Sequence, residues 1–182
     1  RVGPGTRVLD TGCGAGLFAG MAAARGAAAV GIDASEALIL AARERFPEAD
    51  FEMAELEALP FEECTFDAVT GFNVFQYSER PSRALAEAVR VLRFGGRILI
   101  AAWGDPEDCE AMGYVDAVNS FLPSGAVPPG VRAFSEPGSL EALAAASSLS
   151  PVEHAEIDVP FVYPDLETAV RGVLSAGPAA RA

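Results

Sequence analysis

A chain of 182 residues, 51% of them hydrophobic and 21% charged, is long enough to bury a core and too apolar for a disordered protein. Its formal net charge is −13 and its basic residues are all arginines, a balance that argues against binding to nucleic acid or to an anionic membrane surface. No apolar run is long enough to cross a bilayer. We therefore expect one cytoplasmic domain over residues 1–182, and we make no prediction of its oligomeric state.

The first predicted element is a buried strand that ends at Asp10 and opens into a glycine-rich turn. The turn has the pattern Asp-x-Gly-x-Gly-x-Gly, formed by Asp10, Gly12, Gly14 and Gly16. An Ala-rich segment with helical spacing follows at residues 17–25. A strand, a glycine turn and a helix start together form a common cradle for part of a nucleotide-like ligand, because glycine lets backbone N–H groups approach the ligand closely. The alternative is an ordinary turn that binds nothing.

The spacing of the glycines distinguishes between ligands. A dinucleotide fingerprint, G-x-G-x-x-G, would require glycine at position 17, where this chain has Leu17. A nucleotide-binding oxidoreductase is therefore a less favoured function for this chain. Within the turn, the small size of Cys13 explains its presence better than nucleophilic chemistry does. The other cysteines, Cys64 and Cys109, have no metal-ligand spacing, so we expect reduced thiols and no metal site.

A second strand and helix follow the glycine turn directly. Residues 28–33 form a continuous apolar run that ends in Asp33, which suits a parallel strand covered on both faces. Ser35 is a good N-cap for a helix over residues 36–46. A carboxylate at this strand end can accept hydrogen bonds from both hydroxyls of a ribose. The simpler interpretation is that Asp33 only caps the turn.

Strands and helices continue to alternate as far as residue 103. This alternation predicts an α/β fold, Rossmann-like and doubly wound, with a mostly parallel sheet and helices on both faces. The core of the domain is expected over residues 1–104. Its remaining predicted elements are strands at 50–54, 66–72 and 97–103 and a helix at 82–92, with a break at 93–96.

Residues 105–150 are predicted to form an insert and a helix, and residues 151–182 a late strand and helix. The predicted bounds are a helix from about 105 to 121, a Pro/Gly-rich connection at 122–134, a helix at 139–147, a strand at 152–159 and a helix at 165–175. No strand-like segment follows, so we expect either that the seventh strand of such a fold is missing or that the chain is trimmed at its C-terminal end. The insert's apolar residues favour core over pocket: Met112, Tyr114, Val118, Phe121 and Leu122. The single histidine, His154, is interpreted as a surface or packing residue.

Several sequence blocks, in the correct order, resemble the class I S-adenosylmethionine (SAM)-dependent methyltransferases. The glycine turn resembles their motif I. The blocks Leu56-x-x-Leu59-Pro60-Phe61, Phe66-Asp67 and Val91-Leu92-Arg93-Phe94-Gly95-Gly96 resemble later family blocks, with Phe94 in place of the usual proline. The segment Trp103-Gly104-Asp105-Pro106-Glu107 fits the small-molecule branch related to ubiquinone and menaquinone biosynthesis. The resemblance covers residues 2–103 closely and 104–177 loosely, and it implies that the insert within residues 105–150 covers the substrate.

This resemblance implies SAM as the cofactor and a set of residues that contact it. They are Asp10, Gly12, Cys13, Gly14, Asp33, Ala34, Glu55, Leu56 and Asn73. Glu55 stands where the family usually has an aspartate that accepts from the adenine amino group, so its contact is in doubt, and it can equally be a solvated loop charge. The backbone N–H of Leu56 is expected to donate to an adenine ring nitrogen, and Asn73 is expected near the methionine part of the cofactor.

The resemblance also implies a methyl acceptor and a reaction. Phe75, Gln76, Tyr77 and Trp103 are expected to face a small-molecule acceptor, although core packing and a loop amide explain the first three nearly as well. The reaction would be SN2 transfer of the sulfonium methyl to an O, N or C nucleophile. We assign no catalytic residue, and Gln76 and Tyr77 are orienting candidates only. A non-catalytic SAM-binding module is the second alternative.

Overall fold

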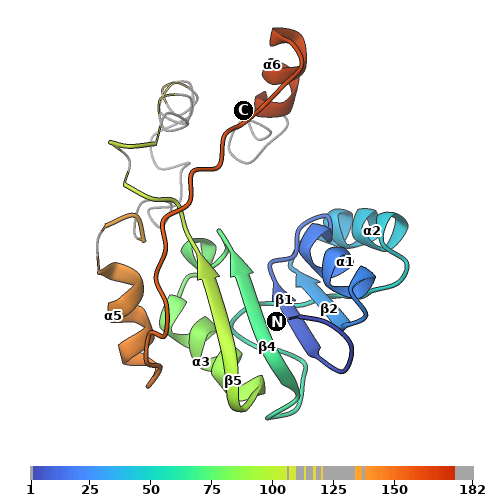
Figure 1. Cartoon of the computed structure of the whole chain (residues 1–182), viewed down its shortest axis with the longest axis vertical. Coiled ribbons are helices and arrows are strands. Elements are labelled where there is room, and N and C mark those ends of the chain that lie inside the picture. The colour runs from blue at the N-terminus through green and yellow to red at the C-terminus, as the bar shows by residue number, and fades with distance from the viewer. Residues whose placement is uncertain are drawn as a thin grey trace.

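The computed structural model describes residues 2–105, 107–109, 113, 117, 120, 134–136 and 138–174. Figure 1 shows a twisted sheet with helices packed against it and α6 (Leu166–Leu174) beyond the carboxyl ends of the strands. The five strands of this sheet are all parallel and lie in the order β3-β2-β1-β4-β5. This architecture confirms the expected Rossmann-like α/β fold.

The elements of the core alternate as the sequence predicts. Their bounds are β1 (Arg7–Thr11), α1 (Leu17–Ala24), β2 (Ala28–Asp33), α2 (Glu36–Arg45), β3 (Asp50–Met53), β4 (Phe66–Phe72), η1 (Phe75–Tyr77), α3 (Pro81–Val91) and β5 (Leu92–Ala101). The bounds of β2 and β4 agree with the predicted ones, and those of the core helices agree to within one residue at each end.

The centre of the sheet is β1, which pairs with β2 on one side and β4 on the other. Leu9 lies opposite Val30 in β2 and Val69 in β4. Because β1 is covered on both faces, its residues from Val8 to Thr11 are all buried, rather than alternately buried and exposed. Val8 and Leu9 are both fully buried, although they point to opposite faces.

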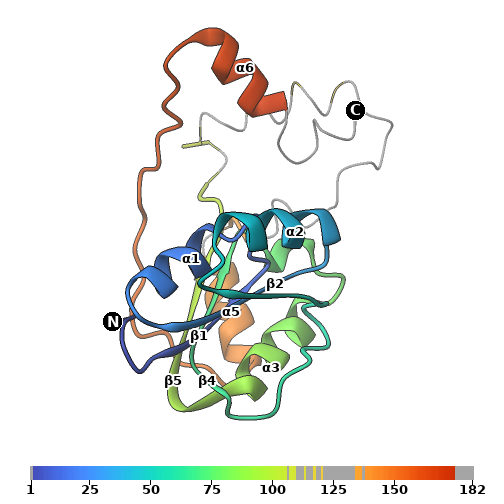
Figure 2. The same ribbon diagram turned by 90° about the vertical axis from the view of Figure 1, so that its right-hand side faces the viewer.

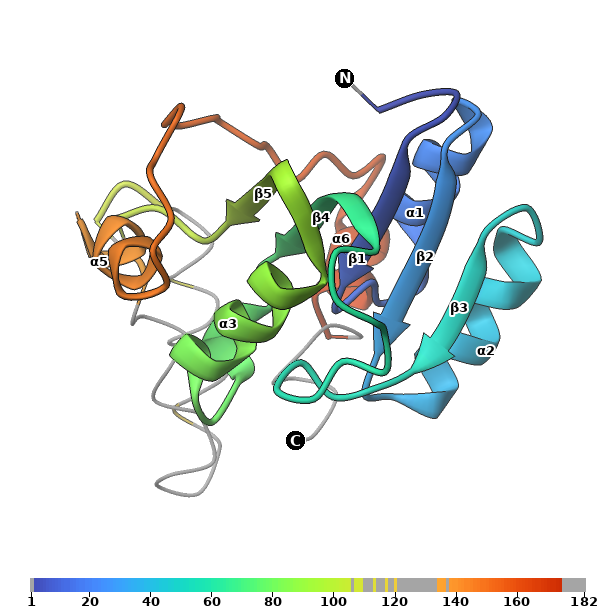
Figure 3. The same cartoon turned by 90° about the horizontal axis from the view of Figure 1, so that it is seen from below.

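Two hydrophobic clusters cover the two faces of the sheet. Figure 3 shows α1 and α2 on one side and α3 on the other. The cluster under α1 and α2 is rich in alanine: Val8, Cys13, Ala19, Ala22, Ala27, Ala29, Ile39, Ala42 and Phe51. The cluster under α3 has larger side chains: Leu9, Ile32, Leu59, Phe66, Val69, Phe75, Ala84, Leu85, Ala88 and Val91. Helix α5 (Ser139–Ala146) packs beside α3.

The start of β5 differs from the prediction. The strand was expected to begin at residue 97 after a break, but it begins at Leu92, directly after α3. Leu92 pairs with Phe66, and the ladder then shifts so that Arg97 pairs with Ala68. Gly95, with a φ of +77°, lies in the extra residues between these two pairs. A bulge therefore absorbs the segment that the sequence indicated as a break. The strand also ends at residue 101 rather than 103.

The strand predicted at residues 152–159 is wrong. These residues pair with no strand of the described sheet, and their side chains, including Ile157 and Val159, are exposed. Their apolar pattern is typical of a strand, but a strand also needs a backbone partner. Figure 2 shows an extended connection from α5 to α6 instead. The five insert residues from Met112 to Leu122 that we assigned to the core, and most of the helix expected at 105–121, lie outside the described residues.

Candidate functional site

The carboxyl ends of β1, β2 and β4 bring the predicted cofactor residues to one edge of the sheet. The strand order reverses at β1, since the chain moves outward to β3 and then returns to β4 on the other side. In open α/β sheets, ligands bind at such a switch point, outside the carboxyl ends of the strands. The glycine turn, Asp33 and Asn73 all follow strands that end at this edge.

The glycines of the turn after β1 have different structural requirements. Gly12, Gly14 and Gly16 all have positive φ values, of 64°, 54° and 83°. A Cβ on Gly12 would lie 2.1 Å from Val74 Cγ2, and one on Gly16 would lie 2.7 Å from the Phe51 ring. A Cβ on Gly14 would meet no heavy atom within 4 Å. The turn is thus packed against the protein at its two ends and open at its centre.

Asp33 joins the end of β2 to the open centre of the turn. Its Oδ2 accepts a hydrogen bond of 3.0 Å from the backbone N–H of Gly14. Its Oδ1 accepts one of 2.9 Å from the backbone N–H of Ser35, at the start of α2. Asp33 therefore does cap a turn, as the simpler interpretation had it, but it also holds the glycine turn in place. Each carboxylate oxygen keeps a further lone pair for a ligand hydroxyl, and Ala34 beside it is exposed.

Asp10 lies deeper than a residue that binds a ligand directly. Only 3% of it is exposed, and the Thr70 hydroxyl donates to its Oδ1 at 2.7 Å. Burial raises the pKa of Asp10 to about 6, although the Thr70 hydroxyl and the backbone N–H of Ala19 lower it. Since Ala19 is in the first turn of α1, Asp10 lies near the amino end of that helix, where the N-cap residue Gly16 has no side chain that could accept a hydrogen bond. Sequence reasoning missed Thr70, which is a mid-strand residue 60 positions away.

The Cys13 thiol in the glycine turn is buried and unreactive. Burial, together with the nearby carboxylates of Asp10 and Asp33, raises the pKa of Cys13 to about 12. A thiol with this pKa stays protonated at neutral pH, and only the thiolate is a good nucleophile. The backbone N–H of Cys13 donates to the Ile32 carbonyl at 2.8 Å, which fixes the turn to the end of β2. Cys13 therefore contributes a backbone hydrogen bond and a small side chain to the turn.

The loop after β3 carries Glu55 and Leu56, and Glu87 and Arg90 of α3 hold its later part. Glu55 is exposed and Leu56 is half-buried. The Glu87 carboxylate accepts from the Leu59 N–H at 2.9 Å, and the Arg90 guanidinium donates to the carbonyls of Leu59 and Phe61. Glu87 and Arg90 also form an ion pair, one turn apart on the helix. Their spacing suggests only a helix-surface pair, so sequence reasoning did not connect them to this loop.

The residues after β4 include two buried polar atoms that have no partner among the described residues. Asn73 has a φ of 51°, and its backbone N–H donates to the Ala101 carbonyl at 2.8 Å. The Oδ1 atom of Asn73 and the Nε2 atom of Gln76 are buried without a hydrogen bond. Because an unpartnered buried polar atom costs about 1–3 kcal/mol, such atoms mark sites where a ligand or water is expected.

The other predicted acceptor residues are spread over different environments. Phe75 is 2% exposed and belongs to the core cluster under α3, whereas Tyr77 is 53% exposed. Trp103 is half-buried, and its ring centroid lies 6.2 Å from that of Phe161, in the connection to α6. The structure thus brings Gln76 and Tyr77 together in η1 but gives Phe75 a packing role. His154 is largely exposed and pairs with Glu141 at 2.9 Å, which agrees with a surface residue.

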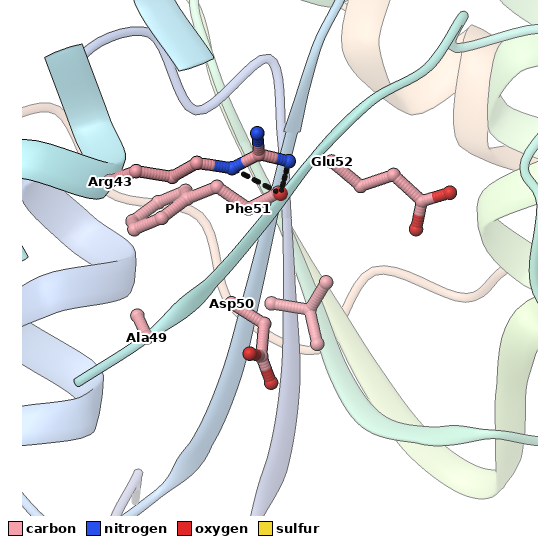
Figure 4. A pocket seen from close by; sticks show the side chains of 6 residues that line it. Arg43, Ala49, Asp50, Phe51 and Glu52 are labelled. Atoms are coloured by element: carbon pink, nitrogen blue, oxygen red, sulfur yellow. Dashed lines mark hydrogen bonds between the residues drawn. The ribbon is translucent and has the colours of Figure 1, made fainter. Parts of the chain in front are cut away.

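An open pocket of about 420 Å³ lies away from the glycine turn, at the outer edge of the sheet along β3. Its lining residues are Val30, Arg43, Ala49, Asp50, Phe51 and Glu52. Figure 4 shows the Arg43 guanidinium bound to the Phe51 carbonyl, with the carboxylates of Asp50 and Glu52 pointing away from it. The pocket contains none of the predicted site residues, and its only cation is already bound to the backbone. We therefore keep the edge at the glycine turn as the candidate site.

The open parallel sheet, the glycine turn at its switch point and the acid after β2 define an α/β domain of the nucleotide-cofactor-binding class. The family model described as a methyltransferase domain matches residues 9–100, and the chain belongs to this family. This confirms the resemblance to the class I SAM-dependent methyltransferases. The match spans all five strands and includes every predicted cofactor residue.

Curated relatives carry related names but are longer than this chain. The chain is 38% identical over 104 residues to a demethylmenaquinone methyltransferase of Renibacterium salmoninarum, covering 57% of the chain and 44% of the relative. It is 34% identical over 126 residues to a malonyl-[acyl-carrier protein] O-methyltransferase of Serratia marcescens, covering 66% of the chain and 49% of the relative. The chain thus spans less than half the length of these relatives.

Solved structures support the same assignment. The YcgJ protein of Bacillus subtilis superimposes with a TM-score of 0.61 at 27% identity, covering 82% of this chain and 63% of that protein. An S-adenosylmethionine-dependent methyltransferase of Mesorhizobium loti gives a TM-score of 0.51 at 30% identity, covering 54% and 47%. Among the helices of the described residues, none has the length and apolarity needed to cross a membrane.

Proposed function

We propose that this chain binds SAM at the glycine turn and transfers its methyl group to a small-molecule nucleophile. The proposal rests on the hydrogen bond from the Gly14 N–H to the Asp33 carboxylate, which lies next to the open space at Gly14. These features fit a cofactor that passes over the turn and presents ribose hydroxyls to Asp33. The unpartnered Oδ1 of Asn73 suits the ammonium group of the methionine part.

In this proposal each part of the site binds one part of the cofactor. Asp33, with Ala34 beside it, would hold the ribose. The backbone N–H of Leu56 would hold the adenine, with Glu55 at the loop surface. Gly12, Cys13 and Gly14 would contact the cofactor through their backbone, and Asp10 would support the turn from below. The relatives' names favour a quinone-like or carrier-bound acceptor over a nucleic acid.

The bound SAM supplies a methyl carbon that its sulfonium already makes electrophilic. The chain's own contribution is to hold the acceptor in line with that carbon and to exclude water, and such positioning can provide much of the rate enhancement. In this proposal Gln76 would orient an acceptor atom through its unpartnered Nε2, and Tyr77 lies next to Gln76 in η1. Trp103 would border the acceptor from the end of β5. We propose no general base, and we propose that the domain acts in the cytoplasm.

Calorimetric titration with S-adenosylhomocysteine, the demethylated product, tests the cofactor site. The wild-type chain is expected to bind this product and to show no binding of NAD. Asp33→Ala should abolish binding, because the ribose loses its acceptor and the glycine turn loses its anchor. The matched control is Asp50→Ala, which removes an exposed carboxylate at the start of β3. Unchanged affinity in Asp33→Ala, or no binding to the folded wild type, would contradict the proposal.

The alternative of a non-catalytic SAM-binding module makes the same binding prediction. The two functions separate when SAM carrying a radiolabelled methyl group is incubated with the chain and extracts that contain quinone precursors or acyl-carrier thioesters. Label transferred to a small molecule by the wild type, but not by Asp33→Ala, supports the enzyme. Tight product binding without transfer to any extract component would support the module.

A further inference from the structure

Glu57, two residues beyond Glu55, connects the loop after β3 to the turn after β4. Its Oε1 accepts from the Ser78 hydroxyl at 2.7 Å and from the Arg80 N–H at 2.8 Å. Its Oε2 accepts from the Arg80 guanidinium at 2.9 Å. The main-chain carbonyl of Glu57 accepts a further bond of 3.1 Å from Arg83, in the first turn of α3. One residue thus makes four hydrogen bonds to a segment more than 20 positions away.

The two segments that Glu57 joins lie at opposite ends of the proposed ligand. Leu56, proposed to hold the adenine, is the residue before Glu57. Tyr77, proposed to face the acceptor, is the residue before Ser78. The turn that carries Tyr77 is closed by hydrogen bonds from Tyr77 and Ser78 back to Val74 and Phe75. Glu57 is therefore connected to η1 through Ser78, which bonds to both.

The contacts of Glu57 differ from those of an ordinary surface ion pair. A single exposed pair contributes about 0–1 kcal/mol, mainly because it must order two long side chains. The Glu57 side chain is only 18% exposed, and two of its three side-chain partners are a hydroxyl and a backbone N–H. These hydrogen bonds, with that from Ser78 the largest cause, lower the pKa of the Glu57 carboxyl, so it is ionised at neutral pH.

We propose that Glu57 is a positioning residue that couples the cofactor's adenine end to the acceptor-facing turn η1. Adenine bound at Leu56 holds the loop that carries Glu57, and Glu57 in turn holds Ser78 and, through it, Tyr77. The acceptor side would then be ordered only when the cofactor is in place. This inference rests on the proposed function, because it requires adenine to bind at this loop. It makes a specific prediction about Tyr77.

Glu87 offers a matched control for this role. It also holds the loop after β3, through the Leu59 N–H, and it also pairs with an arginine of α3. Its side chain is 21% exposed, close to the value for Glu57. Among the described residues, the hydrogen-bond partners of the Glu87 carboxylate are Leu59 and Arg90, and neither η1 nor Ser78 is one of them. Glu87→Ala therefore loosens the same loop without cutting the connection to Tyr77.

The experiment uses adenosine as the probe and ¹⁹F NMR of the chain labelled with 3-fluorotyrosine. Adenosine carries the adenine and ribose but lacks the methionine part, so it occupies the end at Asp33 and Leu56 without reaching Tyr77. The chain has three tyrosines, and Tyr77→Phe assigns the signal of interest. Saturating adenosine is expected to shift the Tyr77 signal in the wild type and in Glu87→Ala. The shift should be lost in Glu57→Ala, which still binds adenosine.

Ser78→Ala provides a second variant that cuts the same connection from the other side. It removes the hydrogen bond to Glu57, together with a longer one of 3.2 Å that the Ser78 hydroxyl accepts from the Arg80 N–H, and it leaves the Glu57 charge in place. It therefore tests the coupling even where Glu57→Ala fails to fold. Its Tyr77 shift is expected to be clearly smaller than that of the wild type. A full Tyr77 shift in folded Glu57→Ala or in Ser78→Ala would overturn the inference. So would adenosine binding to the wild type that leaves the Tyr77 signal unchanged.

The same titrations separate this inference from the proposed function. A wild-type chain that is folded but binds neither adenosine nor S-adenosylhomocysteine would overturn the proposed function, and the role of Glu57 would fall with it. Binding of both ligands with an unresponsive Tyr77 would leave the proposed function in place and remove only the coupling. Loss of the shift in Glu87→Ala as well as Glu57→Ala would mean that any loosening of the loop suffices, which also contradicts a specific role for Glu57.

Discussion

Replacing Gly14 by alanine is expected to weaken cofactor binding while leaving the fold intact. The residue has a φ of 54°, and a Cβ there would meet no protein atom within 4 Å. The only structural cost is the strain of an alanine in the left-handed region, about 1–2 kcal/mol, reduced by the smaller conformational freedom of the unfolded chain. For a protein of this size, each 1 kcal/mol lowers the melting temperature by about 2–4 °C.

The effect on binding should be larger than the effect on stability. In the proposed site, the new methyl group of Gly14→Ala occupies the space through which the cofactor passes. Overpacking of this kind costs about 1–3 kcal/mol, which corresponds to binding that is roughly tenfold to a hundredfold weaker. Calorimetric titration with S-adenosylhomocysteine measures the affinity, and thermal unfolding without ligand measures the stability.

Gly5 provides the matched control for this experiment. It has a φ of 81°, and a Cβ there would also meet nothing within 4 Å, but it lies in the turn before β1. Gly5→Ala is expected to lower the melting temperature by a similar amount and to leave binding unchanged. Equal binding by Gly14→Ala and the wild type would refute the placement of the cofactor over this turn. Equal losses of binding in both variants would show that strain alone weakens the site.

Three further predictions concern stability and solubility. Asp10→Asn should raise the free energy of unfolding relative to wild type by up to about 3 kcal/mol at pH 8 and by little at pH 3, because burial raises the pKa of Asp10 from 3.8 to about 6 in the folded state, so that the stability from this group is present below the lower value and is lost as pH rises through the higher one; an equal difference at both pH values in urea titrations would contradict this. Gly16→Ala, whose Cβ would lie 2.7 Å from the Phe51 ring, should lower the free energy of unfolding by about 2–5 kcal/mol, measured in the same way. Arg43→Ala frees the Phe51 carbonyl on the edge strand β3 and should increase aggregation in light scattering, whereas Arg25→Ala, which removes an equal charge from α1's end, should not.

The sequence was most informative where burial and chain connectivity act together. Strands β2 and β4 have the predicted bounds because both are mainly apolar segments that lie inside a parallel sheet. Asp33 was predicted at the end of β2, and the structure places it against the glycine turn. Local composition was enough here, because each feature depends on residues close together in the chain.

Features that depend on distant partners could not be predicted in this way. The pattern of residues 152–159 indicated a strand, but whether a strand forms is decided by a neighbouring edge with matching register. The bulge at the start of β5 likewise depends on how Leu92 and Arg97 pair with β4. In the candidate site, the bonds of Glu57 to Ser78 and of Thr70 to Asp10 link residues 21 and 60 positions apart.

The different packing of the two faces of the sheet gives them opposite tolerance to mutation. Under α1 and α2, five of the nine clustered residues are alanines, and a Cβ on Gly20 would lie 2.2 Å from the Phe46 ring. On this face a larger side chain destabilises the fold, whereas the alanines have little buried volume to lose by truncation. Under α3, side chains such as Phe66 and Leu85 are fully buried, and truncating them leaves cavities. In a library of random variants, the half that carries the glycine turn would therefore lose enlarged side chains, and the half that carries η1 would lose shortened ones.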